Sequence, residues 1–128
     1  MQFTVTHTFK ASPVQLYAAW LDSKQHAAMT GAEADVSNKV GEEFSAWDGY
    51  ITGRNLELEP NKRIKQAWRT SEFAEDQPDS IIEITFKELA ADKTELTLTH
   101  SELPDSDTQY IDGWGDSYFT PMKEYFDK

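Results

Sequence analysis

Histidine is the residue type in this sequence best suited to acid–base chemistry near neutral pH, and it occurs at positions 7, 26 and 100. His7 and His100 fall at apolar positions of alternating segments, so both rings are expected to face the interior. Such a ring orients a ligand, acts as an acid or base, or serves as a hydrogen-bonded core residue. The core role is favoured, because neither cysteine nor clustered carboxylates accompany these residues at metal-site spacing. His26 lies in a short polar segment and is expected to be solvated.

The segment from His100 to Asp105 raises the alternative of a small hydrolase or cyclase. Ser101 follows His100 directly, but it lacks the strained strand-to-helix turn that exposes a nucleophilic serine. The strand-proximal acids Asp48 and Glu57 are not expected to share the face of the ring. Burial without a carboxylate partner should instead lower the pKa of His100 below about 6.5. The enzyme hypothesis therefore ranks third, and the sequence predicts no catalytic residue, metal ion or cofactor.

Large aromatic side chains are frequent, at 12% of the residues with four tryptophans. Such side chains usually fill a core, but they also line pockets for flat or apolar ligands, and both alternatives stay open here. Ser45, Thr52 and Gln66 are candidates for polar contacts with such a ligand. The residues expected to line a ligand cavity are His7, Trp47, Ile51, Gln66, Trp68, Ile84, Leu98, His100, Trp114, Tyr118 and Met122.

A basic stripe lies on an otherwise acidic chain, whose formal net charge is −11. An acidic chain repels phosphate backbones, which argues against nucleic-acid binding. The stripe either meets an acidic partner surface or pairs across strands with Glu57 and Glu59, and the pairing is favoured. The residues of this basic stripe are Lys62, Arg63, Lys65 and Arg69.

Strand patterns with a period of two dominate the sequence. The clearest is Asn55 to Arg69, which reads as a hairpin turning at Pro60-Asn61, with Leu56 and Leu58 on its apolar face. Ile51 and Gly53 have the opposite parity to these leucines, so a bulge near Arg54-Asn55 is expected to bend the sheet. Further strands are predicted around 3–9, 34–36, 42–47, 82–86 and 96–100, with Asp48-Gly49 as a hairpin turn.

Helical patterns lie near both ends. Ser12-Pro13-x-Gln15 forms a capping box, followed by an apolar stripe of Val14, Tyr17, Ala18 and Leu21. A second short helix is predicted over 24–29, ending at Gly31. Apolar residues then recur at helical spacing over 108–126, where Pro121 should kink or divide the helix. This long stripe comprises Ile111, Trp114, Tyr118, Pro121, Met122 and Tyr125.

The bulk properties bound the class of protein. A length of 128 residues predicts a single domain over 1–128, long enough for a core without staples. The lack of cysteine suits a reducing cytoplasm, and neither a signal peptide nor a membrane-spanning apolar run is read from the sequence. The order of elements predicts an α+β fold: a curved antiparallel sheet of about six to seven strands, two short N-terminal helices and a long C-terminal helix over the sheet.

These motifs, in this order and spacing, resemble the family of activator-of-heat-shock-protein-90-ATPase homologues. That family is a branch of the START-like (SRPBCC, birch-pollen-allergen-like) helix-grip proteins, whose sheet grips the C-terminal helix. The resemblance covers nearly the whole chain. It rests on Ser12-Pro13, Tyr17, Ala19-Trp20, Gly31, Gly41, Phe44, Trp47-Asp48-Gly49, Ile51, Gly53, Leu56-Glu57-Leu58, Pro60, Lys62-Arg63-Ile64, Gln66-x-Trp68-Arg69, Thr94-Glu95-Leu96-Thr97-Leu98, His100, Leu103-Pro104, Gly113-Trp114, Tyr118 and Pro121.

The resemblance implies two functions of different kinds. The first is a non-enzymatic, monomeric domain that binds a small, largely apolar ligand between sheet and C-terminal helix. The second is a co-chaperone-like module that contacts a heat-shock protein 90-type chaperone. Eukaryotic members of the family carry a separate N-terminal domain with the principal chaperone contacts, and this sequence resembles only their C-terminal half. Strong stimulation of a chaperone ATPase by this chain alone is therefore not expected. A shared fold does not by itself imply a shared activity.

Overall fold

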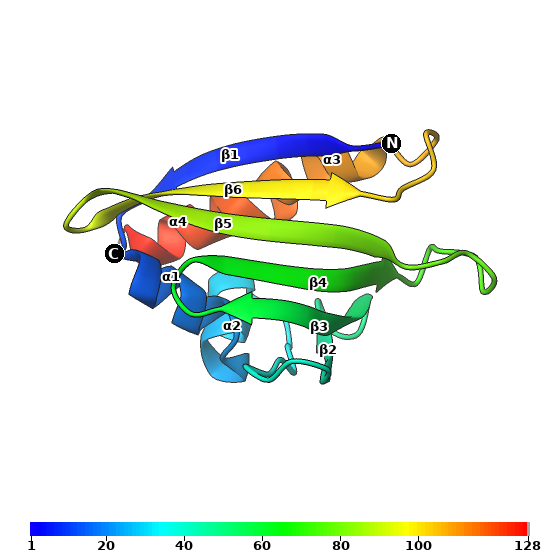
Figure 1. Cartoon of the computed structure of the whole chain (residues 1–128), viewed down its shortest axis with the longest axis horizontal. Coiled ribbons are helices and arrows are strands. Elements are labelled where there is room, and N and C mark those ends of the chain that lie inside the picture. The colour runs from blue at the N-terminus through cyan, green and yellow to red at the C-terminus, as the bar shows by residue number, and fades with distance from the viewer. Residues whose placement is uncertain (128) are drawn as a thin grey trace.

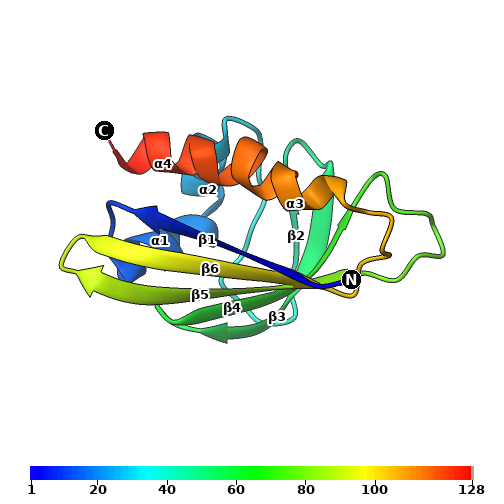
Figure 2. The same ribbon diagram turned by 90° about the horizontal axis from the view of Figure 1, so that it is seen from above.

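The fold is a curved sheet with its helices on one side. The computed structural model describes residues 1–127, in which six strands form one antiparallel sheet in the order β1-β6-β5-β4-β3-β2 (Figure 1). The C-terminal helix runs along one face of this sheet, and the two N-terminal helices lie on the same side (Figure 2). The predicted α+β arrangement is confirmed. The strands are β1 (Phe3–Phe9), β2 (Glu43–Ala46), β3 (Ile51–Glu59), β4 (Arg63–Thr70), β5 (Ser80–Ala90) and β6 (Lys93–Ser101).

The two N-terminal helices begin at side-chain caps. α1 (Pro13–Trp20) has the predicted capping box, and α2 (Ser23–Thr30) begins at Asp22 and ends at Gly31, whose φ is 79°. The predicted stripe on α1 is wrong in phase, because the helix buries Leu16, Ala19 and Trp20 and leaves Val14 and Ala18 exposed. With eight residues, α1 is too short for the spacing of its apolar residues to define the buried face.

The sheet bends where β3 changes register against β4. Asn55 pairs with Gln66 and Glu57 with Lys65, so Leu56 is the extra residue of a bulge. The bulge lies one residue beyond its predicted place, and it removes Leu56 from the apolar face that Leu58 shares. Instead, Asn55 is buried on this face, as Ile51 is.

The segment between α2 and β2 contains no regular strand among the described residues. The strand predicted over 34–36 is reduced to a single bridge, in which Asp35 and Ser45 exchange two backbone hydrogen bonds of 2.9 Å. The side chain of Asn55 holds this segment, donating to the carbonyl oxygens of Ser37 and Lys39. A polar residue at the bulge therefore anchors the loop to the sheet.

The C-terminal helix is continuous but changes its hydrogen bonding. It comprises α3 (Gln109–Gly113), the π-helical η1 (Trp114–Phe119) and α4 (Thr120–Phe126). The backbone N–H of Thr120 donates to the oxygen of Gly115, five residues earlier. Pro121 has no N–H for the preceding turn, and that turn widens into the π-helical segment, so the chain stays helical through the proline where a kink or a division was predicted. The face that the helix buries contains Tyr110, Trp114, Tyr118, Phe119 and Met122, whereas Ile111 is exposed.

Candidate functional site

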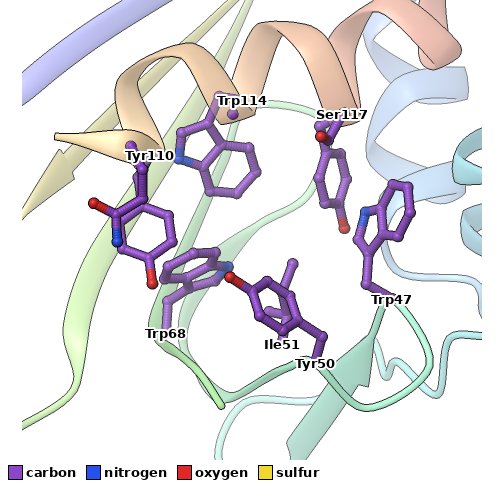
Figure 3. Close-up of a pocket in the computed structure, with 10 residues that line it drawn as sticks. Trp47, Tyr50, Ile51, Trp68, Tyr110, Trp114 and Ser117 are labelled. Atoms are coloured by element: carbon purple, nitrogen blue, oxygen red, sulfur yellow. The ribbon is translucent and has the colours of Figure 1, made fainter. Parts of the chain in front are cut away.

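A pocket of about 190 Å³ opens between the first half of the C-terminal helix and the sheet. Figure 3 shows its labelled side chains arranged around a common space. Its walls come from the β2–β3 turn, from β3 and β4, and from α3 and η1. The lining residues are Trp47, Tyr50, Ile51, Trp68, Gln109, Tyr110, Gly113, Trp114, Ser117 and Tyr118.

The β2–β3 turn places two aromatic side chains at the mouth of the pocket. Trp47, Asp48 and Gly49 all have positive φ, at 52°, 57° and 89°. The Asp48 carboxylate accepts the backbone N–H of Glu33 at 2.7 Å, which fixes the turn to the segment after α2. Left-handed backbone at a tryptophan is costly and persists where the surroundings enforce it. The turn thus holds Trp47 half-buried and Tyr50 exposed beside the opening.

The inner wall is a set of packed aromatic rings. The ring centroids of Trp68 and Trp114 lie 5.4 Å apart, those of Trp68 and Tyr110 lie 5.2 Å apart, and those of Trp114 and Tyr118 lie 5.0 Å apart. Edge-to-face and tilted contacts at these separations are favourable and fix the orientation of each ring. The wall is therefore formed in advance of any ligand.

The tyrosine hydroxyls of the pocket are already engaged by protein groups. The Tyr50 hydroxyl donates to the Glu72 carboxylate, and the Tyr118 hydroxyl bonds Nε2 of His26. The Tyr110 hydroxyl lies 2.7 Å from the hydroxyl of Thr70. Because these polar atoms are satisfied within the protein, the pocket presents mainly ring faces to a ligand.

His100 lies behind the pocket wall and fixes two of its tryptophans. The indole N–H of Trp114 donates to Nδ1 of His100 at 3.0 Å, so Nε2 carries the proton and donates to the Ser80 hydroxyl at 2.8 Å. Ser80 in turn donates to the backbone oxygen of Trp68 at 2.8 Å. The ring points toward the C-terminal helix as predicted, and burial lowers the pKa of His100 to about 3.

The prediction that His26 is solvated is wrong. Its side chain is 2% exposed, and Nδ1 donates to the backbone oxygen of Trp20 at 2.7 Å. Nε2 must then accept the hydroxyl proton of Tyr118, which makes its tautomer opposite to that of His100. Burial is the main cause that lowers the pKa of His26. The eight-residue helix α2 has too weak an apolar pattern to reveal this inward histidine.

Of the residues predicted for the cavity, five line the pocket: Trp47, Ile51, Trp68, Trp114 and Tyr118. The others lie elsewhere, because the centre of the sheet–helix interface is filled by side chains. Ile84, Leu98 and Met122 are fully buried core residues, and His7 packs against Phe119 with ring centroids 4.8 Å apart.

Gln66 belongs to a buried polar chain instead of the pocket. It accepts the indole N–H of Trp20 at 3.4 Å and donates to Asn55 at 2.8 Å. Ser45 and Thr52 pair with each other and lie in a hollow on the opposite face of the sheet, so neither contributes a polar contact to the pocket.

Half of the residues that line the pocket were not predicted from the sequence. Tyr50 ends the β2–β3 turn. Tyr110 lies one helical turn before Trp114, but the predicted C-terminal stripe began at Ile111 instead. Gly113 leaves room for a ligand, since a Cβ added there would meet open space. Gln109 and Ser117 complete the mouth and are exposed.

Two residues of the basic stripe, Arg63 and Lys65, are paired with carboxylates of the sheet. Arg63 contacts Glu57, Glu59 and Glu83 at 3.1, 3.6 and 2.8 Å, and Lys65 contacts Glu57 at 3.3 Å. These cations hold the pKa of Glu57 below its ordinary value, with Arg63 as the larger cause.

Pairing with Glu57 and Glu59 is confirmed for Arg63. Arg69 pairs at 2.8 Å with Asp79, outside the hairpin, and Lys62 is exposed in the turn. Arg69 also donates to two backbone oxygens of the β4–β5 loop, those of Ala74 and Gln77.

Residues 1–127 offer neither a metal-binding cluster of side chains nor a membrane-spanning helix. They contain no group of three or more histidine, cysteine, aspartate or glutamate side chains that could hold a metal ion. None of their helices is long and apolar enough to cross a membrane.

Comparison with known protein families identifies the family of this chain. The family model described as activator of Hsp90 ATPase homolog 1-like protein matches residues 10–127. The chain belongs to this family. The match includes every lining residue of the pocket, and it confirms the resemblance seen in the sequence motifs.

Curated relatives of this Hsp90-activator-like chain are longer proteins. An uncharacterised protein of Schizosaccharomyces pombe is 33% identical over 122 residues, which cover 94% of this chain and 35% of that protein. The activator of 90 kDa heat shock protein ATPase homolog 1 of Homo sapiens is 29% identical over 126 residues, covering 98% and 37%. The chain thus spans about a third of the length of the curated relatives it matches.

Solved structures of the same fold include an HSP90 activator and an Aha1 dimer. An HSP90 activator from Plasmodium falciparum superposes with a TM-score of 0.89 at 24% identity, covering 99% of this chain and 96% of that one. The Aha1 dimer from Colwellia psychrerythraea gives a TM-score of 0.82 at 15% identity, covering 98% and 96%. At these identities the likeness establishes the helix-grip fold of this family member and nothing further.

Proposed function

We propose that this chain is a non-enzymatic binding domain that receives a small, largely apolar group in the pocket beneath Trp47 and Tyr50. The observation that carries the proposal is the engagement of the tyrosine hydroxyls by Thr70, Glu72 and His26, which leaves ring faces as the main contact surface. Concave, mostly apolar sites with pre-formed walls are typical of small-molecule recognition.

The size of the pocket limits the ligand. A volume of about 190 Å³ is somewhat larger than the cavity of about 150 Å³ that takes up benzene in an engineered protein core. It is smaller than the roughly 300–1,000 Å³ typical of sites for drug-sized molecules. The proposed ligand is therefore a single ring or compact apolar group, alone or as one end of a larger molecule.

The geometry does not favour an enzyme. His26 and His100 have both ring nitrogens engaged in hydrogen bonds with protein groups, and neither lines the pocket. Acid–base catalysis needs a titrating group within hydrogen-bond reach of the substrate. The polar lining supplied by Gln109 and Ser117 is uncharged, which suits orientation of a ligand better than proton transfer.

The pocket can be tested by filling it from Gly113. Gly113→Leu adds a side chain where a Cβ meets open space, whereas Gly113→Ala adds one methyl group at the same place. Titration calorimetry with indole should detect binding to the natural chain and to Gly113→Ala, and little or none to Gly113→Leu. Equal binding by all three proteins would place the indole elsewhere and overturn the proposal.

A second candidate function is contact with a heat-shock protein 90-type chaperone. Its support is the family assignment, together with the names of the human relative and of the Plasmodium falciparum protein, both activators of this chaperone. Because the chain spans about a third of the human relative, strong ATPase stimulation by it alone is not expected. Titration against such a chaperone at low and moderate salt tests the contact. Undetectable association at low salt would remove this candidate.

A further inference from the structure

Acidic residues flank the lining residues of the aromatic pocket in the sequence, and we call Asp48, Glu72, Asp112 and Asp116 its acidic rim. Asp48 lies between the lining residues Trp47 and Tyr50 in the turn, and Asp112 and Asp116 each precede a lining residue of the C-terminal helix. All three carboxylates are exposed. Glu72 adds a fourth acid, because its carboxylate accepts the hydroxyl of Tyr50.

The basic residue next to the lining in the sequence of β4 is already paired with a carboxylate. Arg69 follows the lining residue Trp68, but its guanidinium lies 2.8 Å from the Asp79 carboxylate and over the ring of Phe73 at 5.5 Å. Helix residues 107–120 contain neither lysine nor arginine. The field at the mouth therefore attracts cations, in keeping with the net charge of −11.

The ring faces of the pocket favour the same charge. A cation within about 6 Å of a tryptophan or tyrosine ring centroid is attracted by the negative face of the ring, and aromatic cages recognise alkylated ammonium groups in this way. The Tyr50 hydroxyl donates to a carboxylate, which increases the electron density of its ring. Trp47 and Tyr50 of the β2–β3 turn, Trp68 of β4, and Trp114 and Tyr118 of η1 line the pocket, so aromatic rings surround a central group on several sides (Figure 3).

The lining also distinguishes between kinds of cation. A primary ammonium or guanidinium group carries N–H donors that need acceptors when they leave water. The pocket offers few acceptors for such donors, because its tyrosine hydroxyls are engaged with protein groups and the polar lining residues Gln109 and Ser117 are exposed at its mouth. A quaternary ammonium has no N–H group and an apolar surface of methyl groups, so it loses little hydrogen bonding on entry.

We propose that the pocket beneath Trp47 and Tyr50 binds the quaternary ammonium group of a small organic cation. The inference rests on the proposed function of the pocket as a ligand site, and it adds the charge and chemical class of the ligand. The acidic rim attracts the cation and the aromatic faces hold it. The compact volume of about 190 Å³ accepts the alkylated head while any attached chain remains at the mouth.

Three matched probes test the charge. Choline carries the quaternary head, 3,3-dimethylbutan-1-ol is its uncharged carbon isostere, and ethanolamine is a primary amine of the same charge. Titration calorimetry at low ionic strength should show choline binding about ten-fold more tightly than either analogue. Equal or tighter binding of the uncharged isostere would overturn the inference while leaving apolar binding intact. Equal binding of ethanolamine would overturn it as well, because that result indicates general charge attraction.

Variants locate the effect. Trp47→Leu should weaken choline binding several-fold while Trp47→Phe, which keeps a ring, weakens it less. The double variant Asp112→Asn, Asp116→Asn should also weaken it and reduce its salt dependence. Glu88→Gln with Asp92→Asn makes the same charge change at the far β5–β6 turn and should leave it unchanged (Figure 1). A pocket that binds indole but not choline contradicts the cation alone, whereas one that binds neither contradicts the proposed function too.

Discussion

The indole N–H of Trp114 donates to Nδ1 of His100 at 3.0 Å, which joins the C-terminal helix to strand β6 through a single buried hydrogen bond. A charged imidazole would turn this acceptor nitrogen into a second donor. The neutral ring is therefore part of the native packing, and it holds the Trp114 side of the pocket in place.

The free energy of unfolding should consequently decrease as the pH is lowered below about 7. Burial lowers the folded-state pKa of His100 to about 3, below its value of about 6.5 in an unfolded chain. The unfolded chain takes up the proton first, so the contribution of His100 is fully present above pH 6.5 and is lost as pH falls toward 3. The slope for one such group approaches about 1.4 kcal/mol per pH unit. The folded-state pKa values of His7 and His26 are lowered as well, which adds to the effect.

His100→Gln isolates this contribution. Urea unfolding at pH 7.5, 6.5 and 5.5 should show a shallower decline for the variant than for the natural chain, with the fold retained. Identical slopes for the two proteins would mean that His100 is protonated equally in both states, contrary to the hydrogen-bond arrangement described above.

Tyr118→Phe should destabilise the protein without changing its fold. Removing the hydroxyl leaves Nε2 of the buried His26 without a donor, which costs about 1–3 kcal/mol. Tyr125→Phe, at a half-buried position late in the same helix, provides the control and should be nearly neutral. Thermal unfolding compares the two variants. A loss no larger than that of the control would show that His26 finds another donor.

Gly53→Ala should be severely destabilising. An added Cβ would lie 1.9 Å from the backbone oxygen of Ala67 and 2.7 Å from the Phe44 ring, so strands β3 and β4 would have to separate. We expect a loss of at least about 3 kcal/mol in the free energy of unfolding. Gly113→Ala meets open space within a helix and should stabilise slightly. Similar unfolding midpoints for the two variants would contradict this close approach.

Arg63→Ala should destabilise only modestly, and less at high salt. Its guanidinium joins carboxylates of Glu57, Glu59 and Glu83 on a solvent-facing surface, where screening weakens ion pairs. Urea midpoints in low salt and in about 1 M salt, where the screening length is about 3 Å, should converge for variant and natural chain. Loss of chaperone association by a folded variant would instead assign the stripe to a partner surface.

The fold was largely predictable because its signals are local and repeated. Alternation identified strands such as β1 and β6, and the capping box located the start of α1. The C-terminal helix was recognised by its apolar spacing, which placed Trp114, Tyr118 and Met122 on the buried face but also included the exposed Ile111 and did not reveal the π-helical turn at Trp114–Phe119.

The site was predictable only in part, because a cavity is what packing leaves unfilled. Ile84, Leu98 and Met122 have the same apolar character as the residues that line the pocket, yet they fill the core completely. The positions of Tyr50 and His26 were not predicted, because Tyr50 lies in a turn and His26 in a short helix, where hydrophobic periodicity carries little information. Long-range contacts such as His26 with Tyr118 follow from tertiary structure alone.

The most direct test of the pocket uses the indole N–H signals of the four tryptophans in a ¹⁵N NMR spectrum. Trp47, Trp68 and Trp114 line the pocket, whereas Trp20 lies behind Tyr118 and donates to the buried Gln66. On titration with unlabelled indole, the account predicts saturable shifts of the three lining signals, larger than the shift of Trp20 and abolished in Gly113→Leu. If indole at millimolar concentration moves none of the three lining signals, or moves them equally in Gly113→Leu, the pocket does not bind apolar rings and the proposed function is contradicted.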